Sequence, residues 1–477
     1  MILFDYIKNT NRLVVNCDDD NIFNQIREHF SVKNDDAKFA RRFNKFSPKR
    51  KYVITPNGTC ELGLYWDIRK FLRSNQINID VQLTESLEKV INIGIPGVIY
   101  NNFKFNLRDY QLDVVERALN LGRGTCILGT GAGKTFTTAA LIENFYRKSP
   151  DIDTFKCLVI VPDLGLVEQT YKEFIECGST YKLTRWTGSI DPDLTANVII
   201  ANNGIIQSRF DKNDWIKYID LLIVDECHRI TAASKLAKVV KQIKTHHKFG
   251  FTGTLSENLL NQWAVIGRLG PVIYEKNSYE LRQGDHLVNV SVKILNIKYN
   301  TPLRYITDNK YKEELDFIYD SHGRNDIIRR LCSKLSNNIL LLVNHIRHGD
   351  ILEQYLSNIK NKQVFFIRGD VAVDEREKIK EIMENSSNVV CIAISAIFST
   401  GVNIKNLHNI IFTTGGKSFI RTVQSIGRGL RKHDTKEQLL ILDICDDLIY
   451  GVKHNTKRKE IYDKEKIPYT EATISVL

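Results

Sequence analysis

The segment GTGAGKT, residues 129–135, decides the fold of the chain around it. The apolar run Cys126–Leu128 before it predicts a strand, and residues 136–142 after it predict a helix. A glycine-rich loop in this position lets backbone N–H groups approach phosphate oxygens without a clash from a Cβ atom. We therefore predict a site for Mg²⁺–ATP, in which Lys134 reaches the β- and γ-phosphates and the Thr135 hydroxyl holds the ion. The loop glycines of this site are Gly129, Gly131 and Gly133.

A second motif, DECH at residues 225–228, follows the buried-strand run Leu221–Val224. Ligands bind at the carboxyl edge of a parallel sheet, so this edge suits Asp225 as a partner of Mg²⁺ and Glu226 as the base that orients the attacking water. His228 is either a polar residue whose hydrogen bonds serve only the local structure, or a link from the γ-phosphate to the end of the next strand. We favour the link, which would run to Thr252 and Thr254.

A third motif, QSIGRGLR at residues 424–431, places Gln424, Arg428 and Arg431 on one face of a helix. Arginine suits a transferring phosphoryl group because its planar fork donates two hydrogen bonds at once. Arg428 lies 294 residues after Lys134, farther than one nucleotide-binding domain normally spans. We therefore expect an ATP site built from two domains. The competing interpretation is a basic helix face on nucleic acid.

The alternation of short apolar strands with helices predicts two α/β domains with parallel sheets. The first series of strands runs from Cys126 to Phe251 and the second from Val290 to Leu442. Before them, shorter strand and helix patterns predict a small α+β unit. The expected domains are 1–95, 96–278 and 279–450, followed by a C-terminal tail over 451–477.

The net charge of +11 predicts a polyanionic partner. No acidic residue stands between Asp36 and Glu61, nor between Glu384 and Asp434, and basic residues gather in both windows. A solvated basic face is the alternative in each case. In the first window aromatics alternate with cations, which suits a single strand or a junction, although Phe43 and Phe46 would equally suit a small core. The cations proposed there to bind DNA are Arg41, Arg42, Lys45, Lys49 and Arg50.

Composition excludes several other classes of protein. No apolar run approaches the roughly 18 residues that cross a bilayer, and we expect no signal peptide, because Asp5 interrupts the first apolar residues. The nine cysteines are scattered without a C-x-x-C pair, which favours small core residues in a reducing compartment over disulfides or a zinc site. We expect a cytoplasmic protein, in the host cytoplasm if the source is a phage.

The ordered motifs over about residues 105–450 resemble those of superfamily 2 DExH helicases, and most of all the phage UvsW-type recombination and branch-migrating helicases. XPB and the type III restriction translocases are similar too. The resemblance implies that Arg108 and Gln111 read the adenine and that Gly401 and Asn403 contact the nucleotide. It also assigns loops that track a DNA strand, which contain Thr187, Asn202, Asn344 and Thr400. The chain departs from the family pattern at Asp163 and Asn202, and Leu128 departs from the generic phosphate-loop pattern, which has glycine there.

The resemblance implies two tandem RecA-like domains and an ATP-dependent DNA helicase that acts on forks, displacement loops and Holliday junctions in recombination, repair or replication. We expect a monomer that binds single-stranded or branched DNA and no membrane, with recombination or replication proteins as partners. The alternatives are a double-strand translocase of a restriction-type system, an RNA helicase, and a nucleic-acid clamp that uses ATP only as a switch.

Overall fold

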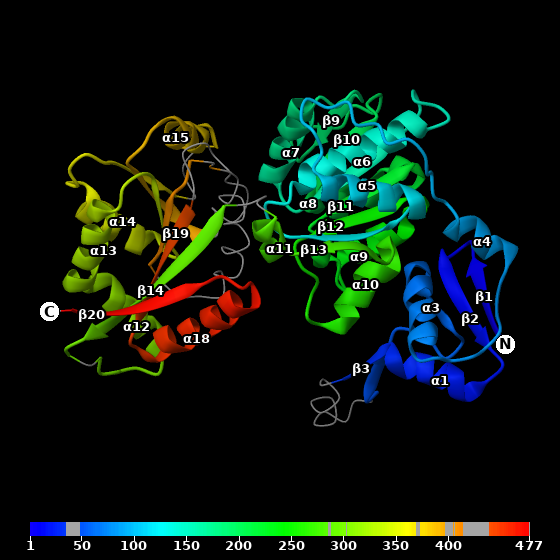
Figure 1. The fold of residues 1–477 in the computed structure, drawn as a ribbon, viewed down its shortest axis with the longest axis horizontal. Coiled ribbons are helices and arrows are strands. Elements are labelled where there is room, and N and C mark those ends of the chain that lie inside the picture. The colour runs from blue at the N-terminus through cyan, green and yellow to red at the C-terminus, as the bar shows by residue number, and fades with distance from the viewer. Residues whose placement is uncertain are drawn as a thin grey trace. The chain divides into compact units, whose positions relative to one another are not determined.

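The computed structural model describes residues 1–34, 48–284, 288–301, 303–368, 373–395, 404, 406–413 and 438–476. Residue contacts divide the chain into two compact units. The first unit holds residues 1–128 and 133–276, and the second holds residues 129–132 and 277–477. In each unit, helices flank a sheet on both sides (Figure 1).

The first unit contains a sheet of seven parallel strands in the order β13-β7-β12-β11-β8-β10-β9. The helices α5, α6 and α7 cover one face of it, and α8, α9 and α10 cover the other (Figure 1). The strands are β7 (Gly124–Leu128), β8 (Cys157–Val161), β9 (Leu183–Trp186), β10 (Val198–Asn202), β11 (Leu221–Asp225), β12 (Lys248–Thr252) and β13 (Val272–Lys276). The helices are α5 (Asp109–Leu121), α6 (Lys134–Lys148), α7 (Leu164–Cys177), α8 (Asn203–Arg209), α9 (Lys235–Gln242) and α10 (Leu259–Leu269).

The central strands of this sheet are apolar because both of their faces are covered. Every residue of β7, β8 and β12 is buried. One core joins alternate residues of β8, β10 and β11 to the apolar faces of α8, α9 and α10. This packing holds the loops at the carboxyl ends of the strands in place.

The amino-terminal residues form a small α+β domain within the first unit. Its four-stranded sheet has the order β5-β2-β1-β6, and β3 pairs with β4 in a separate ribbon. The domain's core continues into Trp263 and Ile266 of α10, so the domain packs directly on this helix of the first seven-stranded sheet. Its elements are β1 (Ile2–Ile7), β2 (Arg12–Cys17), α1 (Asp20–His29), β3 (Ser31–Lys33), β4 (Arg50–Tyr52), β5 (Thr59–Glu61), η1 (Leu62–Leu64), α3 (Tyr65–Ser74), β6 (Val81–Leu83) and α4 (Glu85–Ile91).

The second unit is built on another sheet of seven parallel strands, in the order β16-β17-β15-β18-β19-β14-β20. Its core joins the strands to α13 and α14. The strands are β14 (Asn289–Tyr299), β15 (Ile339–Val343), β16 (Gln363–Ile367), β17 (Val389–Ile394), β18 (Asn409–Phe412), β19 (Gln438–Asp446) and β20 (Tyr469–Val476). The helices include α11 (Ser278–Gln283), α12 (Lys310–Asp320), α13 (His322–Lys334), α14 (Ile346–Leu356), α15 (Val373–Asn385) and α18 (Ile449–Lys464). Two tandem parallel sheets and a small α+β domain confirm the predicted fold class.

The prediction of a tail over residues 451–477 is wrong. These residues complete α18 and then form β20, which pairs with β14 from Tyr469 to Val476. The strand β20 lies at the edge of the sheet, where an alternation of polar and apolar residues is enough to bury one face. The segment therefore closes the second sheet.

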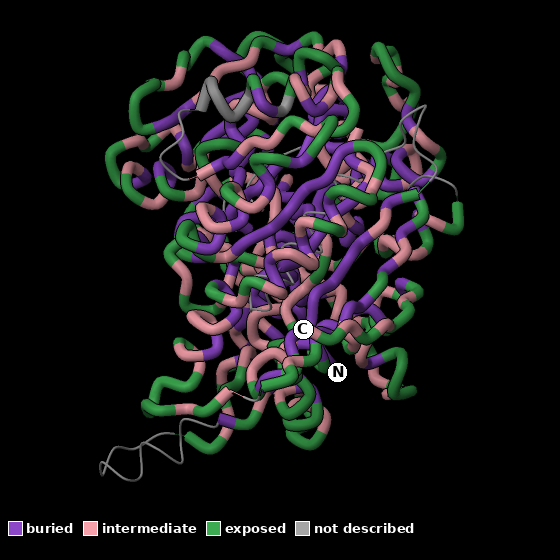
Figure 2. Tube along the Cα trace, turned by 90° about the vertical axis from the view of Figure 1, so that its left-hand side faces the viewer, coloured by how far each residue is buried: buried purple, intermediate pink, exposed green. Residues whose placement is uncertain are grey.

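Buried residues follow the strands, and exposed residues follow the outer helices and loops (Figure 2). Eight of the nine cysteines are buried, as small core residues would be. Among the described residues, no helix is both long enough and apolar enough to cross a bilayer. The same residues contain no group of three or more histidine, cysteine, aspartate or glutamate side chains placed to hold a metal ion.

Candidate ATP site

Three of the predicted motif segments meet at one edge of the first sheet. The strands β7, β12 and β11 are neighbours, and all run in the same direction. The segments that follow them are the glycine-rich loop, residues 252–254 and residues 225–228. A parallel sheet binds ligands at this carboxyl edge, so the fold itself creates the candidate site.

The glycine-rich loop has a backbone that only glycine adopts readily. Gly131 has φ of 83° and Gly133 has φ of 72°, both in the left-handed region. Gly133 caps α6, so Lys134 and Thr135 stand in the first helical turn, where free N–H groups and the helix dipole favour an anion. The Lys134 ammonium donates to the Leu128 carbonyl oxygen at 3.2 Å, which keeps the charge at the loop.

Gln111 lies directly against this loop. A Cβ atom added at Gly133 would meet the Gln111 Nε2 at 2.5 Å, so the end of that side chain would have to move, and the left-handed φ is the stronger reason for glycine there. Gln111 is itself held at the start of α5, where its Oε1 accepts from the backbone N–H of Arg108 at 2.9 Å. The predicted base-reading segment and the phosphate loop are therefore neighbours.

The carboxylate of Glu226 belongs to a polar cluster with His228 and Thr252. The His228 Nδ1 lies 2.8 Å from the Thr252 Oγ1 and 3.2 Å from the Glu226 Oε2. The Thr252 Oγ1 also lies 2.9 Å from the Thr254 carbonyl oxygen and 3.4 Å from the Glu226 Oε2. Asp225, at the end of β11, is half-buried at the same edge.

The distances assign the protons in this cluster. A carbonyl oxygen only accepts, so the Thr252 hydroxyl donates its single proton to Thr254 at the shorter of its two distances. The Thr252 oxygen then accepts from His228, which requires a proton on Nδ1. The same N–H also faces the Glu226 carboxylate, so His228 bridges the ends of β11 and β12.

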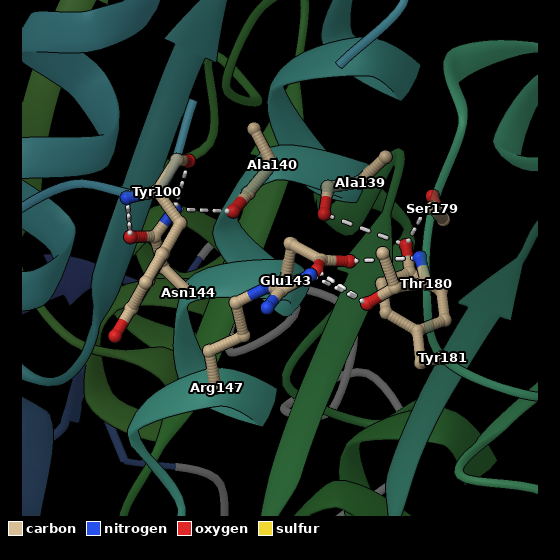
Figure 3. A network of polar contacts seen from close by, with 9 residues as sticks. All are labelled: Tyr100, Ala139, Ala140, Glu143, Asn144, Arg147, Ser179, Thr180 and Tyr181. Carbon is tan, nitrogen blue, oxygen red and sulfur yellow. Dashed lines mark hydrogen bonds and ion pairs between the residues drawn. The ribbon is translucent and has the colours of Figure 1, made fainter. Parts of the chain in front are cut away.

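A network of polar contacts anchors the far half of α6, the helix that carries Lys134 (Figure 3). Glu143 accepts from Arg147 at 2.7 Å and from the hydroxyl of Thr180 at 2.6 Å. At the next residue, the Asn144 side chain exchanges two hydrogen bonds with the backbone of Tyr100. The helix is thus tied to the segment before α5 and to the loop before β9, which fixes the direction in which its first turn points.

The predicted strand-contact residues that the structure describes are scattered over both units. Thr187 caps its own turn, because its hydroxyl accepts from the Ile190 N–H at 3.1 Å. Asn202 ends β10 and Asn344 follows β15, both half-buried at carboxyl ends of strands. Lys49 is exposed, whereas Arg50 pairs with Glu28 at 3.1 Å.

One contact at the site could not be predicted from the sequence. Asp163, which departs from the family pattern, lies 3.7 Å from the guanidinium of Arg229, directly after the DECH motif. The pair links the end of β8 to the end of β11. Several predicted residues lie outside the described part of the chain: Arg41, Arg42, Lys45, Thr400, Gly401, Asn403, Gln424, Arg428 and Arg431.

Two family models match the chain. The model described as the res subunit of type III restriction enzymes matches residues 104–257, and the helicase conserved C-terminal domain matches residues 323–433. The chain is 26% identical to the ATP-dependent DNA helicase uvsW of Enterobacteria phage T4, over 97% of both chains. It is 23% identical to the DNA 3'-5' translocase XPB2 of Sulfurisphaera tokodaii, over 79% of this chain and 88% of that one.

Among solved structures, the ATP-dependent Type ISP restriction-modification enzyme LlaBIII bound to DNA superimposes with a TM-score of 0.58. The likeness covers 85% of this chain and 34% of that chain, at 16% sequence identity. At this identity the superposition establishes a shared fold.

Proposed function

We propose that this chain, an ATP-hydrolysing helicase of superfamily 2, moves along one strand of branched DNA and remodels forks, displacement loops and four-way junctions. The observation that carries the proposal is the edge of the first sheet, where Lys134 and the Glu226–His228–Thr252 cluster follow neighbouring strands. A nucleotide and a water could be held there together.

Lys134 and the N–H groups of the glycine-rich loop would bind the β- and γ-phosphates. The Thr135 hydroxyl and the Asp225 carboxylate are oxygen donors of the kind that Mg²⁺ prefers, and both are half-buried at this edge. They would hold the ion, whose charge would neutralise the phosphates. Gln111 would contact the base.

Glu226 would orient the attacking water and accept its proton. His228 shares its Nδ1–H between Glu226 and Thr252, so a change at the carboxylate would reach β12 and Thr254. This bridge is the proposed route from the phosphates to the strand-contact loops.

The second domain would supply Arg428 and Arg431 as arginine fingers, with Gln424, Gly401 and Asn403 as further contacts to the nucleotide. Closure on ATP would move Asn344 and Thr400 relative to Thr187 and Asn202, and hydrolysis would release them. Repetition of this cycle would step the protein along DNA.

DNA as the substrate is supported by the similarity to a phage DNA helicase and an archaeal DNA translocase, and by the net charge of +11. We further propose that the protein is a monomer, that it acts in a cytoplasm, and that it works with recombination or replication proteins.

The decisive experiment compares ATP hydrolysis with single-stranded DNA, a four-way junction, plain duplex and RNA. We expect the junction and the single strand to stimulate turnover most, and Lys134→Ala to abolish it. Lys172→Ala, an exposed lysine on α7, is the matched control and should hydrolyse ATP normally. ATP turnover that persists in Lys134→Ala would refute the assignment of the ATP site.

The same comparison tests the alternatives. Equal stimulation by plain duplex would favour a double-strand translocase, which the match to the restriction-enzyme model also suggests. Stimulation by RNA alone would favour an RNA helicase. Nucleotide-dependent binding of DNA without turnover would favour a switch-like clamp.

A further inference from the structure

Helix α3 of the amino-terminal domain carries a basic flank that the motifs do not account for. Trp66, Arg69, Lys70 and Arg73 follow the spacing i, i+3, i+4 and i+7, which places them on one side of the helix. The helix is fixed from elsewhere, because Phe71 packs on the His29 ring at 4.4 Å and Ile68 and Leu72 enter the core. Trp66 also packs against this core, whereas the three cations Arg69, Lys70 and Arg73 are not needed to hold α3 in place.

This flank forms one wall of a groove of about 570 Å³. The apolar residues that line it are Tyr65 and Trp66 of α3, Leu83, Ile91, and Leu121 at the end of α5. None of the described lining residues is acidic. The groove thus combines an aromatic and aliphatic surface with a row of cations.

No ion pair within the described residues offsets the positive charge of the groove, although the carboxylate of Asp67, on the same helix, acts on Lys70 over a longer distance. Arg69, Lys70 and Arg73 make no hydrogen bond or ion pair with any of the described residues, whereas nearby Lys89 pairs with Glu85 and Arg50 with Glu28. Behind the wall, the guanidinium of Arg123 lies 5.9 Å from the centre of the Trp66 ring. Arg123 is only 2% exposed, and its two hydrogen bonds run to carbonyl oxygens of Leu269 and Arg268, so it adds a further positive charge.

We propose that this groove binds a single strand of DNA, with its phosphates on Arg69, Lys70 and Arg73 and a base against Trp66. A row of cations beside an aromatic ring suits a strand whose bases are unpaired, because phosphates meet the cations while a base stacks on the ring. In duplex DNA the bases are stacked inside and would leave the apolar surface uncovered. The proposal rests on DNA being the substrate, and it adds a strand site that lies on α3.

The groove is also joined to the candidate ATP site through one rigid element. Leu121 ends α5, and Gln111, in the first turn of the same helix, lies against Gly133. A helix of 13 residues spans about 20 Å. A strand bound in the groove would therefore contact the helix that carries the base-reading segment.

The test uses the full chain and a fluorescent oligothymidine of about 20 nucleotides, with binding followed by anisotropy from about 50 to 200 mM salt. For Arg69→Ala/Arg73→Ala we expect binding about tenfold weaker at the lower salt. The slope of log affinity against log salt should fall by about 1.4, since each phosphate contact on a single strand contributes about 0.7. Trp66→Leu should weaken binding at every salt concentration and leave the slope unchanged.

The matched control is Lys8→Ala/Lys360→Ala, which removes the same charge from exposed positions outside the groove. A slope in the double arginine variant equal to that of the control would overturn the proposal. A loss of duplex binding equal to that of the single strand would also overturn it. ATP hydrolysis separates the two claims: stimulation of the unchanged protein by DNA upholds the proposed function even if the groove fails, and its absence refutes that function.

Discussion

At the scale of single residues, the site depends on one hydroxyl and one unusual backbone angle. Glu226 has φ of 46°, a left-handed conformation that costs a non-glycine residue about 1 kcal/mol or more. Its side chain is nevertheless held in the cluster with His228 and Thr252. Strain of this kind persists only where the surroundings enforce it, and here the enforcing contacts come from the end of β12.

The Thr252 hydroxyl can be removed without changing the shape of its side chain. Thr252→Val should lower ATP turnover about tenfold, because both Thr254 and His228 lose a partner worth about 1 kcal/mol or more. Nucleotide affinity should change little, since the proposed phosphate contacts come from Lys134 and the glycine-rich loop. Steady-state kinetics and nucleotide titration check this, and Thr252→Ser, which restores the hydroxyl, should recover most of the turnover. Equal loss in the valine and serine variants would contradict the role.

His246 makes the first unit sensitive to acid. Burial, followed by the charges of Arg123, Lys248 and His247, lowers the pKa of His246 to about 4. Its Nε2 lies 3.5 Å from the Tyr6 hydroxyl of the amino-terminal domain. The unfolded chain would take up a proton near pH 6.5, whereas the folded chain would not do so until about pH 4.

Stability should therefore be lost as the pH falls from about 6.5 to about 4, by up to about 3 kcal/mol. Urea unfolding at several pH values measures this loss. His246→Gln, which stays neutral, should show a shallower decline and match the unchanged protein at pH 7.5 within about 1 kcal/mol. Parallel pH curves for the two proteins would contradict the assignment.

At the scale of elements, the central strands of both large sheets could be predicted and three edge strands could not. The two predicted series, from Cys126 to Phe251 and from Val290 to Leu442, contain the central strands of both sheets, and β11 extends the predicted run Leu221–Val224 by one residue. The strands that were missed are β9, β13 and β20, which all lie at sheet edges and are only partly buried. An edge strand tolerates polar residues, so it lacks the continuous apolar run that reveals a central strand.

The joint between the amino-terminal domain and α10 rests on a close backbone approach. A Cβ atom at Gly63 would lie 2.1 Å from the Ile266 carbonyl oxygen and 2.8 Å from that of Gly267. Gly63→Ala should therefore destabilise the first unit by about 1–3 kcal/mol, because backbone atoms cannot move aside cheaply. Gly188→Ala, where nothing lies within 4 Å, is the matched control. Urea unfolding measures the free energy of unfolding of both variants. Equal stability of the two would show that the close approach at Gly63 does not hold the domain against α10.

At the scale of the whole molecule, the resemblance to superfamily 2 helicases is confirmed by two family models and by relatives matched over most of their length. The glycine-rich loop and the DECH motif meet at one sheet edge, as their positions after strands predicted. The division of the ATP site between two domains stays a prediction, because the third motif lies outside the described residues.

That division is tested through Arg428. Arg428→Ala should lower turnover by about 10³-fold or more while nucleotide affinity is largely kept, because a finger acts on charge that develops during phosphoryl transfer. Arg421→Ala, which removes a cation from the same window, should keep most of the turnover at saturating DNA. Kinetics and nucleotide binding measured side by side check this. A parallel loss of affinity and turnover in Arg428→Ala would indicate a structural role.

The sequence by itself determined the order of the motifs, the chemistry of each and the class of the fold. These are local properties: a phosphate loop, a carboxylate after a strand and an apolar run are all read within a few residues of each other. Only the tertiary structure decided which distant residues meet. The contact of Asp163 with Arg229, the approach of Gly63 to α10, and the groove between α3 and the end of α5 join segments that share no pattern. Packing brings them together, and packing depends on the whole core.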